Sequence, residues 1–332
     1  MSEKKRILSG VQPTGNLHLG RYLGAIRNWV GLQDDYQCFY SVVNYHAITM
    51  PYKPKKLREQ SWDLVYRLLA CGIKEENLFI QSLVPEHTEL AWILNCNTSY
   101  GELGRMTQFK DKSQQVRETD KDMFISAGLF TYPVLQAADI LIYKPSLVPV
   151  GKDQEQHLEL TRNIAQRFNN VVGNKYFQLP EPLFTRIPKV MSTADPSRKM
   201  SASLGEKHNI DLFADEKRIV KQIKSAVTDS GEVKPDTMSP GIANLFNILW
   251  EINPEVHGQF LEDYKKGNLQ YGVFKEGIAE SLINYLKPIR ERFEEIQADK
   301  KQIRRRVKDS SEEIRKVAAQ TLSEVKELSG LL

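Results

Sequence analysis

The sequence contains few cysteines and no long apolar run. Cys38, Cys71 and Cys96 are far apart, and their spacing fits neither a metal-binding cluster nor a disulfide framework. So few scattered cysteines are typical of a protein in a reducing compartment. No apolar stretch approaches the roughly 20 residues that cross a bilayer, and the first residues are polar and basic. We therefore expect a cytoplasmic protein with no membrane as a partner.

The sequence also lacks a strong excess of charge of either sign. It has 46 lysine and arginine residues against 42 aspartate and glutamate residues, which gives a formal net charge of +4. Such a small positive bias permits RNA binding but does not require it. The 332 residues are enough for one large domain or two ordinary domains, each with its own hydrophobic core.

The most informative part of the sequence is the segment 12–21, Gln-Pro-Thr-Gly-Asn-Leu-His-Leu-Gly-Arg. It follows an apolar run at 6–11, which we expect to be a strand, and it leads into apolar residues with helical spacing. At such a strand-to-helix turn, the N–H groups of the first helical turn would attract phosphate. Gly15 and Gly20 would allow a ligand to approach closely, and His18 would supply a neutral donor.

A second segment, Lys-Met-Ser-Ala-Ser at 199–203, adds one cation and two hydroxyl groups within five residues. These groups suit a polyphosphate ligand. Taken alone, each segment has an ordinary explanation, because a turn with Pro and Gly before a helix is common and a short Lys-Met-Ser loop is usually a surface loop. The two segments in this order are far more specific, and they predict a nucleotide-activating enzyme.

Strand patterns alternate with helical patterns over the first two-thirds of the sequence. The strand candidates lie at 6–11, 38–43, 77–80 and 147–150. This alternation predicts an α/β fold with a parallel sheet, in which ligands gather at the carboxyl ends of the strands.

From about residue 212 onward, helical patterns dominate. A helix beginning at Asp215 would place Lys217, Lys221 and Lys224 along the side opposite its apolar residues. That pattern favours a solvated face slightly over an RNA contact. A further long helical stretch runs from 288 to 332.

The two segments together resemble the two signature sequences of the class I aminoacyl-tRNA synthetases. The rest of the sequence is similar to the tryptophanyl-tRNA synthetase family, and this resemblance covers nearly the whole chain. It is carried by blocks such as His-Ala-Ile-Thr at 46–49, Arg-Met-Thr-Gln-Phe-Lys at 105–110, Ala-Ala-Asp-Ile-Leu at 137–141, Val-Pro-Val-Gly at 148–151 and Ala-Val-Thr-Asp-Ser at 226–230.

The resemblance implies a Rossmann-like catalytic domain at 1–205 and an all-helical domain at 206–332 for the anticodon region of tRNA, with the last helix packed back on the catalytic domain. It implies that ATP activates L-tryptophan to tryptophanyl-adenylate and that the tryptophanyl group is then transferred to tRNA(Trp). It also implies a homodimer. Mg²⁺ is expected with ATP, bound mostly through phosphates and water, so no metal site made of protein carboxylates is expected.

The resemblance further implies roles for individual residues. Lys112, Lys199 and Ser201 match catalytic positions, where lysine suits a phosphate because it carries a compact charge on a long stem. The matches to ATP-binding positions are Gln12, Pro13, Thr14, Gly20, Arg21, Gly151, Lys152, Asp153, Val190, Lys199, Met200, Ser201, Ala202 and Ser203. The matches to tryptophan-binding positions are Leu8, His46, Tyr132, Gln136, Asp139 and Gln154.

Four positions depart from the pattern of the family. Arg21 stands where the family usually has Asn or His, and Ala202 stands where many bacterial members have a second lysine. Lys152 replaces a usual acidic residue, and Asn44 with Tyr45 replaces an Asp-Gln pair. We hypothesise that the cations at positions 21 and 152 offset the charge that is lost at position 202.

The choice of substrate depends on two places in the sequence. Tyr132, Gln136 and Asp139 share one face of a helix, where Asp139 can accept a hydrogen bond from an indole N–H. The tyrosyl-tRNA synthetases use a similar arrangement, so this helix alone does not decide. Leu8 stands where those enzymes have a tyrosine that meets the substrate phenol. An unpaired buried hydroxyl costs about 1–3 kcal/mol, so tryptophan fits this position better.

The sequence leaves three alternatives open. One is a tyrosyl-tRNA synthetase, and another is a non-catalytic RNA-binding paralogue, which Arg21, Lys152 and Ala202 suggest. The third is a small-metabolite nucleotidyltransferase, but such chains are usually shorter and lack a helical third.

Overall fold

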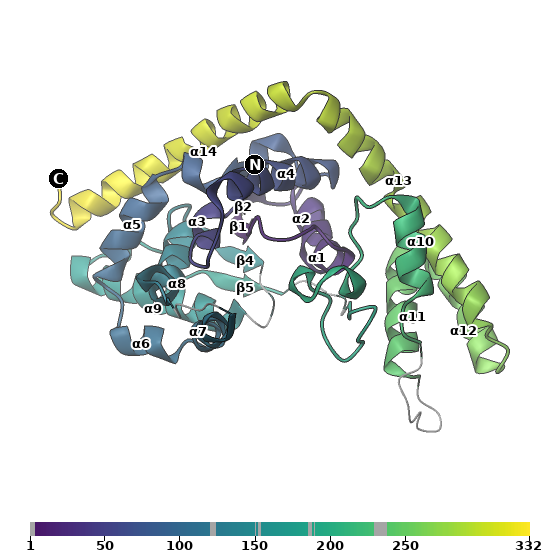
Figure 1. Cartoon of the computed structure of the whole chain (residues 1–332). Helices are drawn as coiled ribbons and strands as arrows, with labels where there is room; N and C mark the ends of the chain where they lie inside the picture. The colour runs from purple at the N-terminus through teal and green to yellow at the C-terminus, as the bar shows by residue number, and fades with distance from the viewer. Residues whose placement is uncertain are drawn as a thin grey trace.

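The computed structural model describes residues 4–119, 124–149, 151, 154–184, 188, 190–228 and 238–332, without the side chains of Thr119 and Ser203. Within these residues, five parallel strands form one sheet in the order β3-β2-β1-β4-β5. The strands are β1 (Arg6–Val11), β2 (Gln37–Val42), β3 (Leu78–Ile80), β4 (Leu147–Pro149) and β5 (Glu181–Leu183). Figure 1 shows the sheet surrounded by helices, with a group of helices extending from it on the right. The predicted α/β class with a parallel sheet is confirmed.

Four of these strands were expected from the sequence. β1 has the predicted bounds, β2 begins and ends one residue earlier than predicted, and β3 begins one residue later than predicted. For the range 147–150, β4 matches the first three residues, and Val150 lies outside the described residues. β5 was not predicted, because its three residues include Pro182 and a short edge strand carries little periodic pattern.

The strand order creates a switch point beside β1. The chain first builds outward from β1 through β2 to β3, and it then returns to add β4 and β5 on the other side of β1. Connections that leave in opposite directions open a crevice beyond the carboxyl ends of the two central strands. The fold therefore places a ligand site next to the end of β1.

Helices follow most of the strands and cover the sheet (Figure 1). Helix α8 packs against both α5 and α9, and α4 packs against β2. The helical elements before residue 205 are α1 (Leu19–Arg21), the π-helical turn η1 (Tyr22–Ile26), α2 (Arg27–Leu32), α3 (Asn44–Ala47), α4 (Pro54–Ala70), η2 (Glu75–Asn77), η3 (Gln81–Leu83), α5 (Glu86–Asn95), α6 (Tyr100–Arg105), α7 (Thr107–Thr119), α8 (Ala127–Leu141), α9 (Glu155–Val172) and η5 (Ala202–Leu204).

Two hydrophobic cores lie on the two faces of the sheet, because successive side chains of a strand point to opposite faces. Ile7 of β1 belongs to the core that includes residues of α4, α10 (Glu216–Lys224), α11 (Pro240–Ile252) and α13 (Tyr271–Ala298). Its neighbour Leu8 belongs to the second core, with residues of α5, α8, α9 and α14 (Lys300–Leu328). Thus β1 packs against a hydrophobic core on each face.

After residue 205, the regular elements in the described part of the chain are all helical. Its elements are η6 (Glu206–His208), α10 (Glu216–Lys224), α11 (Pro240–Ile252), α12 (Pro254–Lys265), α13 (Tyr271–Ala298) and α14 (Lys300–Leu328). The predicted start at Asp215 is confirmed, because its carboxylate accepts a hydrogen bond from the backbone N–H of Arg218 and caps α10. The division of the chain at residue 205 stays a prediction.

The predicted helical stretch 288–332 is wrong at its start. Pro288 lies inside α13, and the helix break falls at Asp299, whose side chain caps α14. Packing of α13 on α4 and α10 holds the helix together where a proline removes a backbone donor. α14 then runs back along the sheet region and packs against β3 and α5 (Figure 1).

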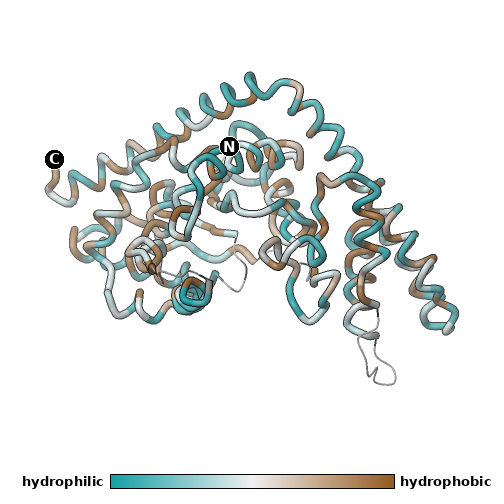
Figure 2. Tube along the Cα trace, in the orientation of Figure 1, coloured by the Kyte–Doolittle hydropathy of each residue, from teal (hydrophilic) through white to brown (hydrophobic). Residues whose placement is uncertain are grey.

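Figure 2 shows apolar residues recurring among polar ones along α14, as expected for a helix with one buried face. In the described part of the chain, no helix has the length and apolar character that crossing a membrane requires.

Candidate functional site

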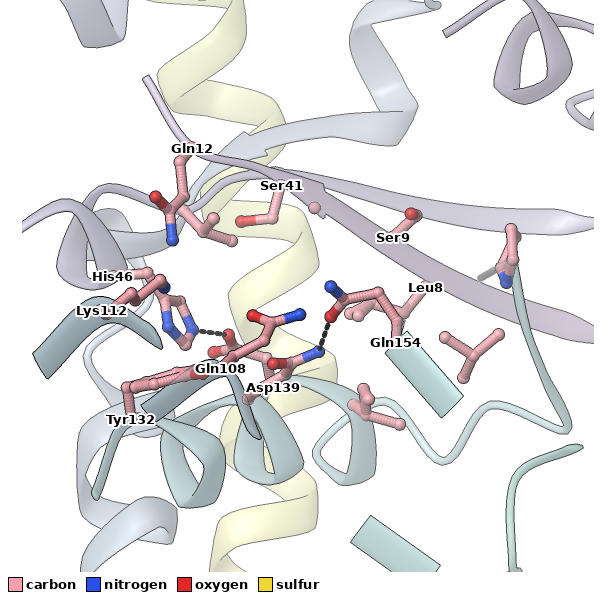
Figure 3. A pocket seen from close by; sticks show the side chains of 16 residues that line it. Leu8, Ser9, Gln12, Ser41, His46, Gln108, Lys112, Tyr132, Asp139 and Gln154 are labelled. Atoms are coloured by element: carbon pink, nitrogen blue, oxygen red, sulfur yellow. Dashed lines mark hydrogen bonds and ion pairs between the residues drawn. The ribbon is translucent and has the colours of Figure 1, made fainter. Parts of the chain in front are cut away.

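A cavity of about 320 Å³ opens at the carboxyl ends of β1 and β2 and extends to β4, across the switch point between β1 and β4. Its walls come from both strands, from α3, α7, α8 and β4, and from the residue before α9 (Figure 3). This size is within the range of small-molecule sites. The lining residues are Leu8, Ser9, Gly10, Gln12, Ser41, Val43, His46, Gln108, Lys112, Tyr132, Gln136, Asp139, Ile140, Val148, Pro149 and Gln154.

The structure brings all of the predicted tryptophan-side residues into this cavity. They are Leu8, His46, Tyr132, Gln136, Asp139 and Gln154, and Gln12 and Lys112 line it as well. The i, i+4, i+7 spacing on α8 has the expected result, since the three side chains from that helix face the same space. The Nε2 group of Gln136 donates a hydrogen bond to the Oε1 atom of Gln154 at 3.4 Å.

Asp139 is the centre of a buried hydrogen-bond network. Its Oδ2 atom lies 2.7 Å from Nε2 of His46, and its Oδ1 atom lies 2.6 Å from Nδ1 of His87. The Nε2 group of Gln81 donates to both carboxylate oxygens, at 2.7 and 2.9 Å. The Oη atom of Tyr143 lies 2.8 Å from the other ring nitrogen of His87. The carboxylate is therefore fixed in orientation before any ligand enters.

The network also keeps Asp139 ionised. Burial opposes the charge of this carboxyl group, but the neighbouring His46 and His87 more than compensate, and its pKa is lowered to about 2. Gln81, His87 and Tyr143 were not predicted from the sequence. For Gln81, the sequence did carry a signal of a role in ligand binding. The residue directly follows β3, and ligands gather at the carboxyl ends of parallel strands.

Lys112 lies over the ring of Tyr132, with Nζ 4.5 Å from the ring centroid. Burial lowers the pKa of Lys112, and the described residues provide no carboxylate within ion-pair distance of it. An ammonium group in a partly buried cavity without an anionic partner is well placed to meet an anionic ligand.

The segments 12–21 and 199–203 are in direct contact beside this cavity. The backbone N–H of Gly20 donates to the Sδ atom of Met200 at 3.3 Å, and the N–H of Met200 donates to the carbonyl oxygen of Val190 at 3.1 Å. Gly15 has a φ of +69°, and a Cβ atom at that position would lie 2.6 Å from the Cβ of Ala202. A glycine at 15 is thus needed both for the backbone turn and for the contact between the two segments.

The expectation that the first helical N–H groups would be open to phosphate is wrong. The N–H of Leu19 donates to the carbonyl oxygen of Ile210, that of Gly20 donates to Met200, and that of Arg21 donates to Nδ1 of His18. These groups are already bonded within the protein, because the chain around 210–212 packs against residues 17–19. Side-chain cations, not backbone N–H groups, are therefore the groups left to bind phosphate at this turn.

His18 is neutral at physiological pH, as the sequence predicted. Burial, together with the charges of Arg21 and Lys199, lowers its pKa to about 4. Both cations are thus near His18. Arg21 donates from Nη1 to the carbonyl oxygen of Thr14 at 3.4 Å, and it forms no ion pair with any residue that the structure describes.

The remaining predicted residues lie around these segments or outside the description. Pro13 and Thr14 line a second, neighbouring cavity. The carbonyl oxygen of Gly151 accepts a hydrogen bond from the N–H of Gln154 at 2.9 Å, and Ser201 is partly buried. The predictions that lie outside the described residues are Lys152, Asp153 and the side chain of Ser203. No three His, Cys, Asp or Glu side chains in the described ranges are grouped so that they could hold a metal ion.

The chain was compared with known proteins. The family described as "tRNA synthetases class I (W and Y)" matches residues 1–287. The tryptophan–tRNA ligase of Helicobacter pylori is 49% identical, and the match covers 99% of each chain. The chain belongs to the tryptophan–tRNA ligase family. Another relative in this family, the tryptophan–tRNA ligase of Clostridium tetani, is 44% identical, and the match covers 99% of this chain and 96% of that one.

A solved structure of the family has the same fold. The crystal structure of tryptophanyl-tRNA synthetase from Campylobacter jejuni, complexed with ADP and tryptophan, is similar with a TM-score of 0.85 and 36% identity. The match covers 98% of this chain and 100% of that one. The family assignment confirms the resemblance found in the sequence, and it argues against a small-metabolite nucleotidyltransferase.

Proposed function

We propose that the chain is a class I tryptophan–tRNA ligase, which uses ATP to activate L-tryptophan and transfers the tryptophanyl group to tRNA(Trp). The observation that carries this proposal is the convergence of the six predicted tryptophan-side residues on one cavity, beside the contact between the segments 12–21 and 199–203. The relatives named tryptophan–tRNA ligase, similar over their full length, support it.

Asp139 selects the substrate side chain. Three donors, from His46, His87 and Gln81, occupy a carboxylate that has about four acceptor sites, so it can accept one further hydrogen bond from the indole N–H. Leu8 and Ile140 supply apolar surface for the ring. A phenol placed against Leu8 would lose a hydrogen bond, which costs about 1–3 kcal/mol.

In the first step, an oxygen of the tryptophan carboxylate attacks the α-phosphorus of ATP. The bond from that phosphorus to the bridging oxygen of the β-phosphate breaks, and pyrophosphate leaves. Lys112 and Lys199, with Ser201, stabilise the charge that develops on the phosphates, and most of the rate comes from positioning and electrostatics. Arg21 adds a third cation on the side where Ala202 supplies none.

The ATP molecule occupies the region between the two segments. Its phosphates lie near Gln12, Pro13, Thr14 and Arg21. The adenine packs on Gly20, Val190 and Met200. The ribose lies against Gly151, Lys152 and Asp153. The close contacts among Gly20, Met200 and Val190 support this arrangement. The segment 199–203, including Ala202 and Ser203, closes over the nucleotide.

Mg²⁺ would bind mainly through the ATP phosphates and water and would neutralise part of their charge. In the second step, a hydroxyl group of the terminal ribose of tRNA attacks the carbonyl carbon of the adenylate. The bond from that carbon to the phosphate oxygen breaks, and AMP leaves with the electron pair of that bond on its phosphate oxygen.

The protein works as a homodimer in the cytoplasm, with residues 1–205 as the catalytic domain and 206–332 as the tRNA-binding domain. Support for the dimer comes from an apolar surface around Trp92 of α5, whose side chain is 70% exposed. A shallow cavity of about 430 Å³ beside it is lined by Ile48, Ala91 and Leu135 among others. Such a patch is typical of a protein–protein interface.

The direct test is charging of a tRNA(Trp) transcript by the purified protein with radiolabelled tryptophan and ATP. We expect tryptophanyl-tRNA to form only when ATP is present. If the folded protein binds the transcript but charges it with neither tryptophan nor tyrosine, it is the non-catalytic paralogue. Charging with tyrosine would instead identify a tyrosyl-tRNA synthetase.

A further inference from the structure

A second cavity, of about 500 Å³, lies beside the segment 12–15; ATP accounts for Pro13 and Thr14 on one wall, and the opposite wall, from Met50 to Gln60, has no assigned role. It is formed by that segment, the end of α3, the connection to α4 and the first turns of α4. Its lining residues are Pro13, Thr14, Gly15, Ala47, Met50, Pro51, Tyr52, Lys53, Lys56, Leu57 and Gln60.

This cavity is separated from the first one by a single layer of chain. Gln12 lines the first cavity, whereas Pro13 lines the second. In α3, His46 lines the first cavity, and the next residue, Ala47, lines the second. A ligand in the second cavity would therefore lie next to the place where the tryptophanyl-adenylate forms.

The chemistry of the second cavity suits an anionic chain with exposed bases. Lys53 and Lys56 are exposed, and within the described part of the chain neither has an ion pair. No carboxylate is among the lining residues, all of which the structure describes. Tyr52 is 49% exposed, so its ring is open to stacking. Lysines that neutralise phosphates and an aromatic ring that stacks on a base are the usual elements of single-stranded RNA sites.

The position of the other cations argues against a second set of ATP phosphates here. Lys112 lines the first cavity and not the second. Arg21 and Lys199 both act on His18, and although the Nη1 group of Arg21 donates to the carbonyl oxygen of Thr14, neither cation lines the second cavity. The second cavity thus has its own pair of lining cations, Lys53 and Lys56.

We propose that this cavity binds the unpaired 3′ end of tRNA, with Lys53 and Lys56 on its phosphates and Tyr52 stacked on a base. This inference rests on the proposed function, because it requires the terminal ribose to reach the adenylate. The occupant is the short stretch of unpaired nucleotides that precedes the terminal one, and the terminal ribose reaches past the segment 12–15 to the adenylate in the first cavity.

The experiment compares two reactions of the full-length protein. Pyrophosphate exchange uses only tryptophan, ATP and pyrophosphate, whereas charging also requires tRNA. In a Lys53→Glu/Lys56→Glu variant, we expect kcat/KM for tRNA in charging to fall by about tenfold or more, while exchange stays within about twofold of wild type. Lys55→Glu is the matched control, because Lys55 is on the same helical turn and exposed but does not line the cavity.

A binding measurement locates the effect at the 3′ end. Wild-type protein should bind a tRNA(Trp) transcript more tightly than the same transcript without its unpaired 3′ nucleotides, and the double variant should bind the two equally. Tyr52→Ala should reduce the same difference.

Three outcomes would overturn the inference: unchanged charging in the double variant, an equal loss in the Lys55→Glu control, or a raised KM for ATP in exchange. The last would assign the cavity to ATP phosphates. Failure of exchange in the wild-type protein itself would contradict the proposed function instead, so the two failures are distinguishable.

Discussion

At the scale of single residues, the surrounding structure fixes the orientation and the charge of Asp139 before a ligand binds. Three side chains from three different elements hold its carboxylate: His46 from α3, Gln81 from η3 and His87 from α5. Such an ionised and oriented acceptor is expected to discriminate by hydrogen bonding, because a ligand without an N–H at that point would leave a buried charge less well solvated.

The lowered pKa of Asp139 has a consequence for stability. Because its pKa falls from 3.8 to about 2 in the folded protein, the ionised carboxylate contributes stability that is fully present above about pH 4 and is lost as the pH falls toward about 2. We expect urea unfolding to show wild type more stable than Asp139→Asn at pH 5–7, with the difference shrinking below about pH 4. A difference that stays constant down to about pH 2.5 would contradict this assignment.

A second prediction for single residues concerns Arg21 and Ala202. Arg21→Asn should lower kcat/KM for ATP in pyrophosphate exchange by about 10–100-fold, because it removes an unpaired cation from the turn beside Lys199. KM for tryptophan should be nearly unchanged. Adding Ala202→Lys to the Arg21→Asn variant should recover part of the loss, since it restores a cation to the same region. An Arg21→Asn variant that uses ATP as well as wild type would rule out this role.

At the scale of elements, the essential feature is the contact between the turn at 12–21 and the segment 199–203, which are far apart in the sequence. Gly15 and Ala202 approach so closely that a Cβ on Gly15 would clash, and Met200 accepts the N–H of Gly20. Any movement of the segment 199–203 during a reaction is therefore transmitted directly to the turn that precedes α1.

Gly15→Ala tests this contact. Gly15 and Gly173 both have positive φ, +69° and +64°, but only Gly15 has a neighbour within 4 Å of the added Cβ. We expect both alanine variants to lose about 1 kcal/mol of stability from backbone strain, and only Gly15→Ala to raise KM for ATP by several-fold. Thermal unfolding and exchange kinetics measure the two effects. Equal ATP kinetics in the two variants would show that the contact is not required.

The elements also show what the sequence could and could not predict. β1 and the helix from Leu19 onward were predictable because their apolar residues follow regular periods. Spacing also put Tyr132, Gln136 and Asp139 of α8 on one face, and the family resemblance indicated that this face meets the substrate. The π-helical turn at Tyr22–Ile26, the continuation of α13 through Pro288 and the bonded N–H groups at the first turn were not. Each depends on packing against segments that are distant in the sequence, and no local pattern records such contacts.

At the scale of the whole molecule, the apolar surface around Trp92 predicts how the protein assembles. Tyr132 lines both the first cavity and the shallow cavity beside Trp92, so the proposed dimer interface lies directly behind the substrate pocket. Trp92→Glu should convert a dimer into monomers in analytical ultracentrifugation and should raise KM for tryptophan. Trp250→Glu, which changes a 44% exposed tryptophan on α11, should remain dimeric. A monomeric wild-type protein at micromolar concentration would contradict the proposed assembly.

The most direct test of the account is pyrophosphate exchange into ATP with tryptophan and with tyrosine supplied separately. The pocket built around Asp139 and Leu8 predicts exchange with tryptophan and a kcat/KM for tyrosine that is lower by about 5–150-fold, since an unpaired phenol costs about 1–3 kcal/mol. Asp139→Asn should reduce exchange with tryptophan. Equal or faster exchange with tyrosine would contradict the account of the pocket, and it would mean that a group such as the partnerless Ser41 hydroxyl accepts or donates to the phenol.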